Sequence, residues 1–332
     1  MQSYSAKEKR SMFSISTVWN AWRHKTAQSM VAELKDLGFD RLELSFGLPS
    51  KMVADISLMV EEGAIAVGSL HNYCPSPMLR DGQSLSHSIL PLSNTDEEDR
   101  RWAVRQTMRT IETAHSLGAS AVVLHMGKVL IRPISPKLMM LAENGEVQSG
   151  RSDRLRSKLR KRRELKKESY LEQAAKSLRD LAPHAEELGI KLGIENRYYP
   201  EEIPDLNEIG QLIEWTNSPA VGYWHDMGHA AVKENIGWGP HLEYLERYGD
   251  RLVGMHIHDV ILTRDHRAPL QGELDFSSLV EYMREDLLKV MEVHPIATAE
   301  EIKNGLAFLR RLTGEVGSEP EASDKISMEE KF

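Results

Sequence analysis

Histidine and acidic side chains lie at the ends of short apolar segments throughout this chain. Eight such segments are rich in β-branched and apolar residues, and six of them end in His, Glu or Asp. Imidazole and carboxylate groups bind divalent cations and also transfer protons, so a set of this kind suits a metal site or acid–base catalysis. The residues are His71, His125, Glu195, Asp226, His256, His258 and Glu292.

Side-chain alternation indicates which of these residues point the same way. In the segment at 190–195, two apolar residues form one face, which turns Glu195 to the other. The same alternation in the segments at 251–258 and 289–294 places His256 and Glu292 on the inward face, and we expect Asp226 to join them. Because clustered carboxylates disfavour joint ionisation, a divalent cation held by three carboxylates and one imidazole is expected there. Mn²⁺, Mg²⁺, Co²⁺ and Zn²⁺ all suit this ligand set, and the sequence does not choose among them.

The segments that carry these residues alternate with stretches of helical spacing, several of which end in the Leu-Gly signal of a helix terminus. Eight strand–helix units predict a parallel sheet closed as a (β/α)8 TIM barrel, whose active site lies at the carboxyl ends of the strands. An open doubly wound sheet is the alternative. No glycine-rich phosphate motif follows the third segment, so no dinucleotide site is expected. The expected strands span residues 13–19, 41–46, 64–71, 120–125, 190–195, 220–226, 251–258 and 289–294.

One barrel domain is expected over residues 12–313. An N-terminal extension of residues 1–11 precedes it, and the composition of residues 314–332 predicts a disordered tail. Long loops follow the third and fourth strands, at residues 72–94 and 129–168. Loops of that length are often functional, so we expect the first of them to cover the barrel mouth.

Charge and composition disfavour nucleic acids and membranes as partners. The chain has 42 basic and 50 acidic residues, a net charge of −8, which is the wrong sign for binding mainly to phosphates. A basic helical insertion around 150–168 holds ten Lys or Arg within 151–167, but it lacks the aromatic residues that stack on bases. A solvated helical extension is therefore favoured over a nucleic-acid patch. No apolar window suits a membrane span or signal peptide, so a cytoplasmic location is expected, and the single Cys74 excludes an internal disulfide.

Seven motifs in order along the chain resemble those of the xylose-isomerase-like barrels. This superfamily includes sugar isomerases and epimerases, sugar-acid dehydratases and the apurinic-site endonuclease called endonuclease IV. The resemblance extends over roughly residues 12–312. The motifs are SLHNYCP, VVLHMG, GIENRYY, WHDMGHA, GMHIHD, DHRAPLQGELDF and VMEVHP.

The resemblance implies a role for each matching residue. In the epimerases the metal ligands correspond to Glu195, Asp226, His256 and Glu292, and the two glutamates exchange the proton of the substrate carbon. His229 would contact a substrate oxygen. The endonuclease holds three zinc ions with further ligands, which correspond to His71, His125, His229 and His266.

This sequence departs from the superfamily pattern at two positions. Arg264 stands where the endonuclease has an Asp ligand, although Asp265 is adjacent, and this puts a third metal in doubt. Leu270 stands where the commoner relatives carry Gly, so a different loop backbone is expected. Arg197 is expected either to clamp a carboxylate or phosphate of the substrate or to pair with an acidic ligand, whereas His258 and Asp259 are expected to brace the metal ligands or the loop that follows.

The leading functional prediction is a metal-dependent isomerase or epimerase of a small sugar or sugar phosphate. It would work through a metal-stabilised enediolate, with Glu195 and Glu292 as acid and base. One alternative is a keto-sugar or cyclitol dehydratase or lyase on the same site, and another is a phosphodiesterase like endonuclease IV. A non-catalytic binding protein is the least favoured reading. The sequence does not identify the substrate, the metal or the oligomeric state, and it allows a homo-oligomer.

Overall fold

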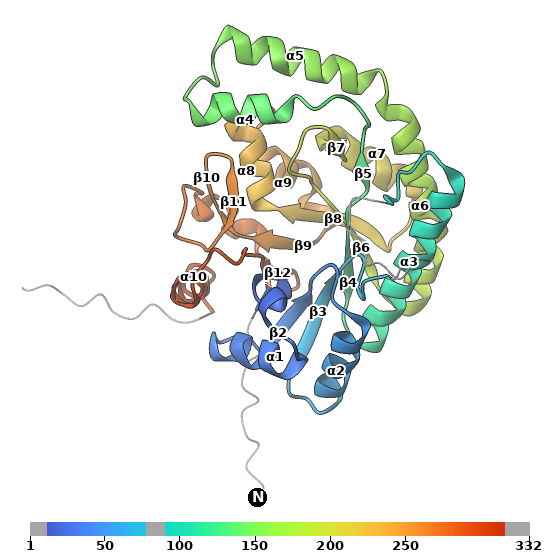
Figure 1. Cartoon of the computed structure of the whole chain (residues 1–332), viewed down its shortest axis with the longest axis vertical. Helices are drawn as coiled ribbons and strands as arrows, with labels where there is room; N and C mark the ends of the chain where they lie inside the picture. Colours follow the sequence, from blue (N-terminus) through green and yellow to red (C-terminus); the bar gives the residue numbers. More distant parts are fainter. Residues whose placement is uncertain (1–11, 78–89, 316–332) are drawn as a thin grey trace, which may run out of the picture.

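Eight parallel strands close into a barrel at the centre of the molecule (Figure 1). The computed structural model describes residues 12–77 and 90–315. The first strand pairs with the second on one side and with the last on the other, which closes the sheet. This confirms the predicted (β/α)8 barrel. In sequence order the barrel strands are β1 (Phe13–Ser16), β2 (Arg41–Leu44), β3 (Ala66–His71), β4 (Ala121–Leu124), β6 (Lys191–Glu195), β8 (Val221–Asp226), β9 (Leu252–Ile257) and β12 (Leu288–Met291).

Amphipathic helices surround the barrel. In α10, Thr298 and Glu301 form a capping box, and Ile302, Leu306 and Leu309 are buried. At the end of α6, Gly189 has φ 68°, the left-handed conformation that the Leu-Gly signal predicts. The helices are α1 (Ala27–Asp36), α2 (Ser50–Glu61), α3 (Glu97–Ser116), α6 (Lys167–Leu188), α7 (Leu206–Thr216), α8 (Met227–Asn235), α9 (Glu243–Tyr248) and α10 (Ala299–Leu312).

The strand–helix alternation is incomplete after the seventh strand. There the chain forms a hairpin of β10 (Asp259–Ile261) and β11 (Arg264–Arg267), followed by a 3-10 helix at Phe276–Tyr282 in place of an α-helix. Leu270, in the same connection, has φ 76°. The expectation of a different loop backbone is therefore not supported here, because a positive φ is the conformation that glycine adopts most readily.

The insertion after β4 forms two helices, α4 (Ser135–Glu143) and α5 (Gly150–Glu164), which lie together across one side of the barrel (Figure 1). They share a small apolar core with Ile236 and Trp238. α5 is a helix of its own and ends before α6 begins. Several basic side chains on its outer face are exposed, as a solvated helix predicts: Arg151, Arg154, Lys158 and Lys161.

Arg163 differs from these exposed side chains because its guanidinium is buried. It pairs with the buried carboxylate of Glu208, with 2.6 Å between Nη2 and Oε2. It also donates hydrogen bonds to the carbonyl oxygens of Pro200 and Glu202, both at 2.8 Å. Through Arg163, the buried side of α5 is therefore hydrogen-bonded to the loop that follows β6.

The loop after β6 also pairs with the loop after β4. Their short strands β5 (Gly127–Lys128) and β7 (Glu202–Ile203) form an antiparallel pair. Glu201 extends the contact by accepting hydrogen bonds from the backbone N–H groups of Ile134 and Ser135 at the start of α4. Both loops are thus fixed at the same end of the barrel.

Three expectations fall wholly or partly outside the described residues: the extension 1–11, much of the loop 72–94 (residues 78–89) and most of the expected tail (residues 316–332). Within residues 12–77 and 90–315, no helix has the length and apolar character needed to cross a membrane. Cys74 is buried, and burial raises the pKa of its thiol.

We expect Arg163→Met to lower the free energy of unfolding by about 3 kcal/mol, since it leaves Glu208 buried without its counter-charge. Urea denaturation followed by circular dichroism would measure this loss. Lys158→Met on the exposed face of the same helix is the matched control, and its effect should stay within about 0.5 kcal/mol. Equal effects of the two substitutions would show that the buried pair does not anchor the insertion.

Candidate metal centre

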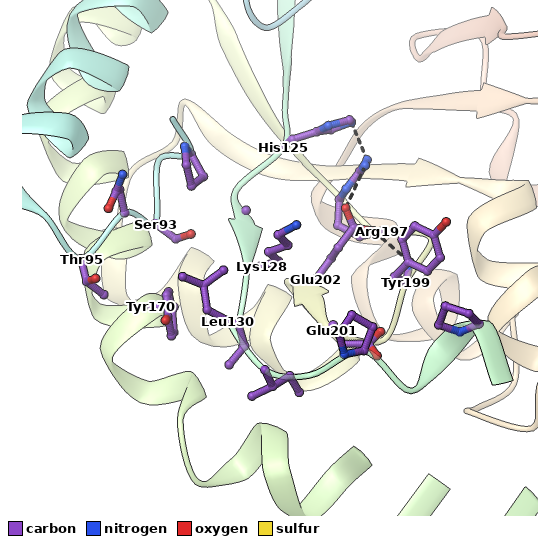
Figure 2. Close-up of a pocket in the computed structure, with 17 residues that line it drawn as sticks. Ser93, Thr95, His125, Lys128, Leu130, Tyr170, Arg197, Tyr199, Glu201 and Glu202 are labelled. Atoms are coloured by element: carbon purple, nitrogen blue, oxygen red, sulfur yellow. Dashed lines mark hydrogen bonds and ion pairs between the residues drawn. The ribbon is translucent and has the colours of Figure 1, made fainter. Parts of the chain in front are cut away.

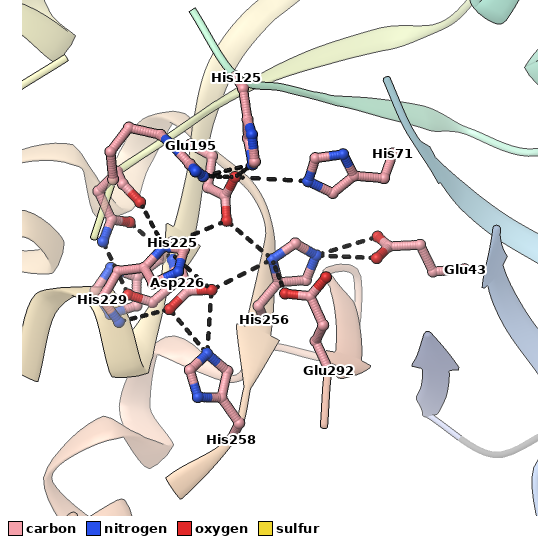
Figure 3. Close-up of polar contacts among 12 residues, drawn as sticks. Glu43, His71, His125, Glu195, His225, Asp226, His229, His256, His258 and Glu292 are labelled. Atoms are coloured by element: carbon pink, nitrogen blue, oxygen red, sulfur yellow. Dashed lines mark hydrogen bonds and ion pairs between the residues drawn. The ribbon is translucent and has the colours of Figure 1, made fainter. Parts of the chain in front are cut away.

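Four strands bring three carboxylates and one imidazole together at the carboxyl end of the barrel (Figure 3). Glu195 ends β6, Asp226 ends β8, His256 lies in β9 and Glu292 directly follows β12. The Nδ1 atom of His256 lies 3.2 Å from Oε1 of Glu195, 3.5 Å from Oδ2 of Asp226 and 3.1 Å from Oε2 of Glu292. The structure therefore places together the four residues that alternation selected.

Burial gives this group a strong requirement for positive charge. All four side chains are buried. Burial alone would lower the pKa of His256, but the charges of Glu292 and Glu43 raise it well above its ordinary value. Burial raises the pKa of Glu292, as expected where several carboxylates share one enclosed space. A cation among them would relieve that repulsion.

These residues fit a divalent ion. One ligand atom from each lies within 4.8 Å of the others, and the set mixes oxygen with one nitrogen, which suits Mn²⁺, Mg²⁺, Co²⁺ or Zn²⁺. A neutral imidazole with Nε2 protonated would leave Nδ1 as the nitrogen ligand facing the carboxylates.

Glu43 holds the other side of the imidazole. It lies on β2, is fully buried, and accepts a hydrogen bond at 3.0 Å from Nε2 of His256. Ser69 donates a second hydrogen bond to the same carboxylate, at 2.8 Å. A carboxylate behind a metal-binding histidine fixes the tautomer of the ring and makes it a stronger ligand. Glu43 is not among the residues predicted from the sequence, although the alternation of Leu42 and Leu44 around it gives the same inward signal.

Asp226 is oriented by its neighbours along β8 and β9. His258 donates to Asp226 from Nε2, at 3.0 Å from Oδ1, and its Nδ1 accepts the backbone N–H of His266. The pKa of Asp226 lies well below its ordinary value because the charges of His229 and His258 outweigh the effect of burial. Asp259 accepts backbone N–H groups of the following loop, from Val260, Gly272 and Leu274. His258 thus contacts Asp226, and Asp259 contacts the following loop, as their predicted bracing roles require.

A second group of possible ligands adjoins the first through Glu195. It consists of His71 at the end of β3, His125 directly after β4, and Glu195. Oε2 of Glu195 lies 2.6 Å from Nε2 of His125 and 3.7 Å from Nε2 of His71. Arg197 also reaches this position, with Nη1 at 2.7 Å from the same oxygen. Of the two roles expected for Arg197, the structure therefore favours pairing with an acidic ligand.

A third group lies on the opposite side, where His229 of α8 faces the hairpin β10–β11. Its members are His229, Asp265 and His266. Oδ2 of Asp265 lies 3.7 Å from Nε2 of each histidine. The pairing register of the hairpin shifts by one residue, and His266 has φ 53°, which brings two adjacent side chains toward His229.

That bulge changes the interpretation of Arg264. Its side chain is 60% exposed and points toward Glu143, at 3.6 Å. Asp265 takes the inward position in place of Arg264, so this geometry does not support the doubt about a third metal that Arg264 raised.

A cavity of about 510 Å³ opens above these groups. Its lining includes His71, His125, Arg197, His229 and His266, and the glutamates Glu195 and Glu292, whereas Asp226 and His256 lie beneath it. A neighbouring cavity of about 570 Å³ shares His125, Arg197, Tyr199 and Glu202 with it, and its other walls come largely from the apolar loop after β4 (Figure 2). A small polar ligand therefore has room beside the four-ligand group.

The family model described as xylose isomerase-like TIM barrel matches residues 31–312. An uncharacterized protein of Sinorhizobium fredii, y4fM, is 30% identical over 228 residues, which cover 68% of this chain and 60% of that protein. The chain thus spans less than two thirds of this relative.

Solved structures share the fold at low sequence identity. A D-tagatose 3-epimerase-like protein matches with a TM-score of 0.64 and 18% identity, over 91% of this chain and 98% of its own. The 3-keto-D-glucoside 4-epimerase of E. coli matches with a TM-score of 0.64 and 18% identity, over 91% and 99%. These similarities concern the fold alone.

We expect Glu43→Gln to weaken binding of Mn²⁺ by about 10- to 100-fold, because the amide keeps the shape of the carboxylate but removes the charge behind His256. Isothermal titration calorimetry of the metal-free protein would measure the affinity. Glu187→Gln on the exposed face of α6 is the control and should bind Mn²⁺ like the unsubstituted chain. Unchanged affinity in Glu43→Gln would exclude the bracing role.

Proposed function

This chain belongs to the xylose isomerase-like TIM barrel family, and on that premise we propose that it is a metal-dependent epimerase or isomerase of a small sugar or sugar phosphate. Glu195, Asp226, His256 and Glu292 are the proposed ligands of one divalent ion. The similarity of fold to proteins named as sugar epimerases agrees with the proposal.

One observation carries the proposal: the four ligands divide into two layers. Asp226 and His256 are fully buried and do not line the cavity, so holding the ion is their proposed role, whereas Glu195 and Glu292 also line the cavity. The two glutamates come from β6 and from the end of β12, which are not neighbours in the barrel. A substrate seated between them therefore meets a carboxylate from each side.

This arrangement suits proton transfer at a carbon next to a carbonyl group. One glutamate removes the proton from one face, and the other returns a proton to the opposite face, which inverts the configuration of that carbon. A bound divalent ion would act as a Lewis acid that stabilises negative charge on the substrate oxygens. His229 faces the same cavity and is positioned to hydrogen-bond a hydroxyl group, with its Nδ1 donating to the carbonyl oxygen of Asn196 at 3.0 Å.

Two alternative reactions use the same residues. A dehydratase or lyase would begin with the same proton removal and then expel a hydroxyl group from the adjacent carbon. A phosphodiesterase like endonuclease IV gains support from the three groups of possible ligands described above, which are among four such groups in the described residues. The ion pair of Arg197 with Glu195 opposes it, because a guanidinium already lies at one of those three positions.

We expect Glu195→Gln and Glu292→Gln each to lower the exchange of the substrate α-proton by at least about 100-fold, since an amide does not transfer the proton. The assay would incubate keto-sugars and their phosphates with the Mn²⁺-loaded protein in deuterated water and follow the α-carbon by NMR. Glu187→Gln is again the control. Full exchange in both active-site variants would exclude the proposed mechanism.

The same assay separates the reaction classes. An epimerase or isomerase incorporates deuterium without loss of water, whereas a dehydratase yields a product that lacks one hydroxyl group. Cleavage of a duplex that carries an abasic site, with no change in any sugar tested, would instead support the phosphodiesterase.

A further inference from the structure

Glu195 presents its two oxygens to two different sites. Oε1 faces the four-ligand group, at 3.2 Å from Nδ1 of His256. Oε2 faces the second group, at 2.6 Å from Nε2 of His125. A carboxylate in this position can bridge two cations, so the chemistry of the second position decides how many cations the centre holds.

A cation already lies at the second position. Nη1 of Arg197 donates to Oε2 of Glu195 at 2.7 Å. The same atom also contacts Nε2 of His125 (Figure 2). A metal ion bound by His125 and Glu195 would need the same lone pairs that these two atoms offer to Nη1. Since a guanidinium keeps its proton in proteins, the metal and the arginine exclude each other.

The surrounding loop holds the guanidinium in place. Nη2 of Arg197 lies 3.4 Å from Oε1 of Glu202, and Oε2 of Glu202 accepts the backbone N–H of Tyr199 at 2.9 Å. The backbone of Glu202 is in turn fixed by Arg163 of α5 and by the strand pair β5–β7. The Arg197 side chain is only 9% exposed, so a metal that displaced it would have to move a buried charge.

We propose that the guanidinium of Arg197 takes the place of a second metal ion between His71, His125 and Glu195. The arginine supplies the positive charge that Glu195 requires on that side and closes the position to metals. This inference rests on the proposed four-ligand centre, and it concerns the number of ions that the protein holds, not the reaction that it catalyses.

The test is a count of bound ions in variants of the full chain. Arg197→Met removes the guanidinium and frees the lone pairs of His125 and Glu195. After equilibration with Zn²⁺ and removal of unbound metal, elemental analysis should find about one more ion per chain than in the unsubstituted protein, because a vacated set of two imidazoles and one carboxylate suits zinc. Adding His125→Ala to Arg197→Met should bring the count back down.

Arg154→Met, an exposed position on α5, is the matched control and should leave the count unchanged. If Arg197→Met binds no additional ion, the proposal is overturned. Crystals of the unsubstituted protein grown with Zn²⁺ provide an independent test that requires no variant to fold. An anomalous peak between His71, His125 and Glu195 in those crystals would overturn the proposal, and its absence there would support it. Both readouts are separate from turnover, so failure to find a sugar substrate would leave them intact.

Discussion

The structure of the candidate site depends on one electrostatic constraint, the burial of four carboxylates at one end of a barrel. Glu43, Glu195, Asp226 and Glu292 all lie within reach of a single imidazole or its close neighbours. Their mutual repulsion in a medium of low dielectric requires compensating positive charge. The surrounding histidines, the arginine after β6 and the proposed ion each supply part of it, and the polar contacts of the barrel mouth follow from this requirement.

Depth in the barrel assigns different tasks to chemically similar groups. Glu43 is fully buried, does not line the cavity and contacts only the far side of the His256 ring and Ser69 among the groups described above. Asp226 and His256 are also fully buried and do not line the cavity, whereas Glu195 and Glu292 border it. Glu43 thus has a different environment from Glu195 and Glu292, although all three side chains point into the barrel.

Local pattern in the sequence was sufficient to predict the strands and the four proposed ligands, because a barrel turns alternate residues inward. The same rule applies to Glu43, which lies inside its strand and not at the strand end where the predicted residues lie. Asp265 was beyond this kind of reasoning, since a bulge with a positive φ at His266 breaks the alternation. The pairing of Arg197 was equally undetermined, because it depends on how the loop after β6 packs against distant parts of the chain. Likewise, Arg163 belonged to a basic run that looked uniformly solvated, and its partner Glu208 lies on another helix.

The insertion after β4 has a consequence for how this site evolves. Arg163 of that insertion fixes the carbonyl oxygen of Glu202, and the Glu202 side chain lies behind Arg197. A surface helix and the arginine beside the candidate metal centre are therefore connected through a single intervening residue. A homologue that lost α4 and α5 would also lose this support, so we expect the insertion and the arginine to be inherited as one unit.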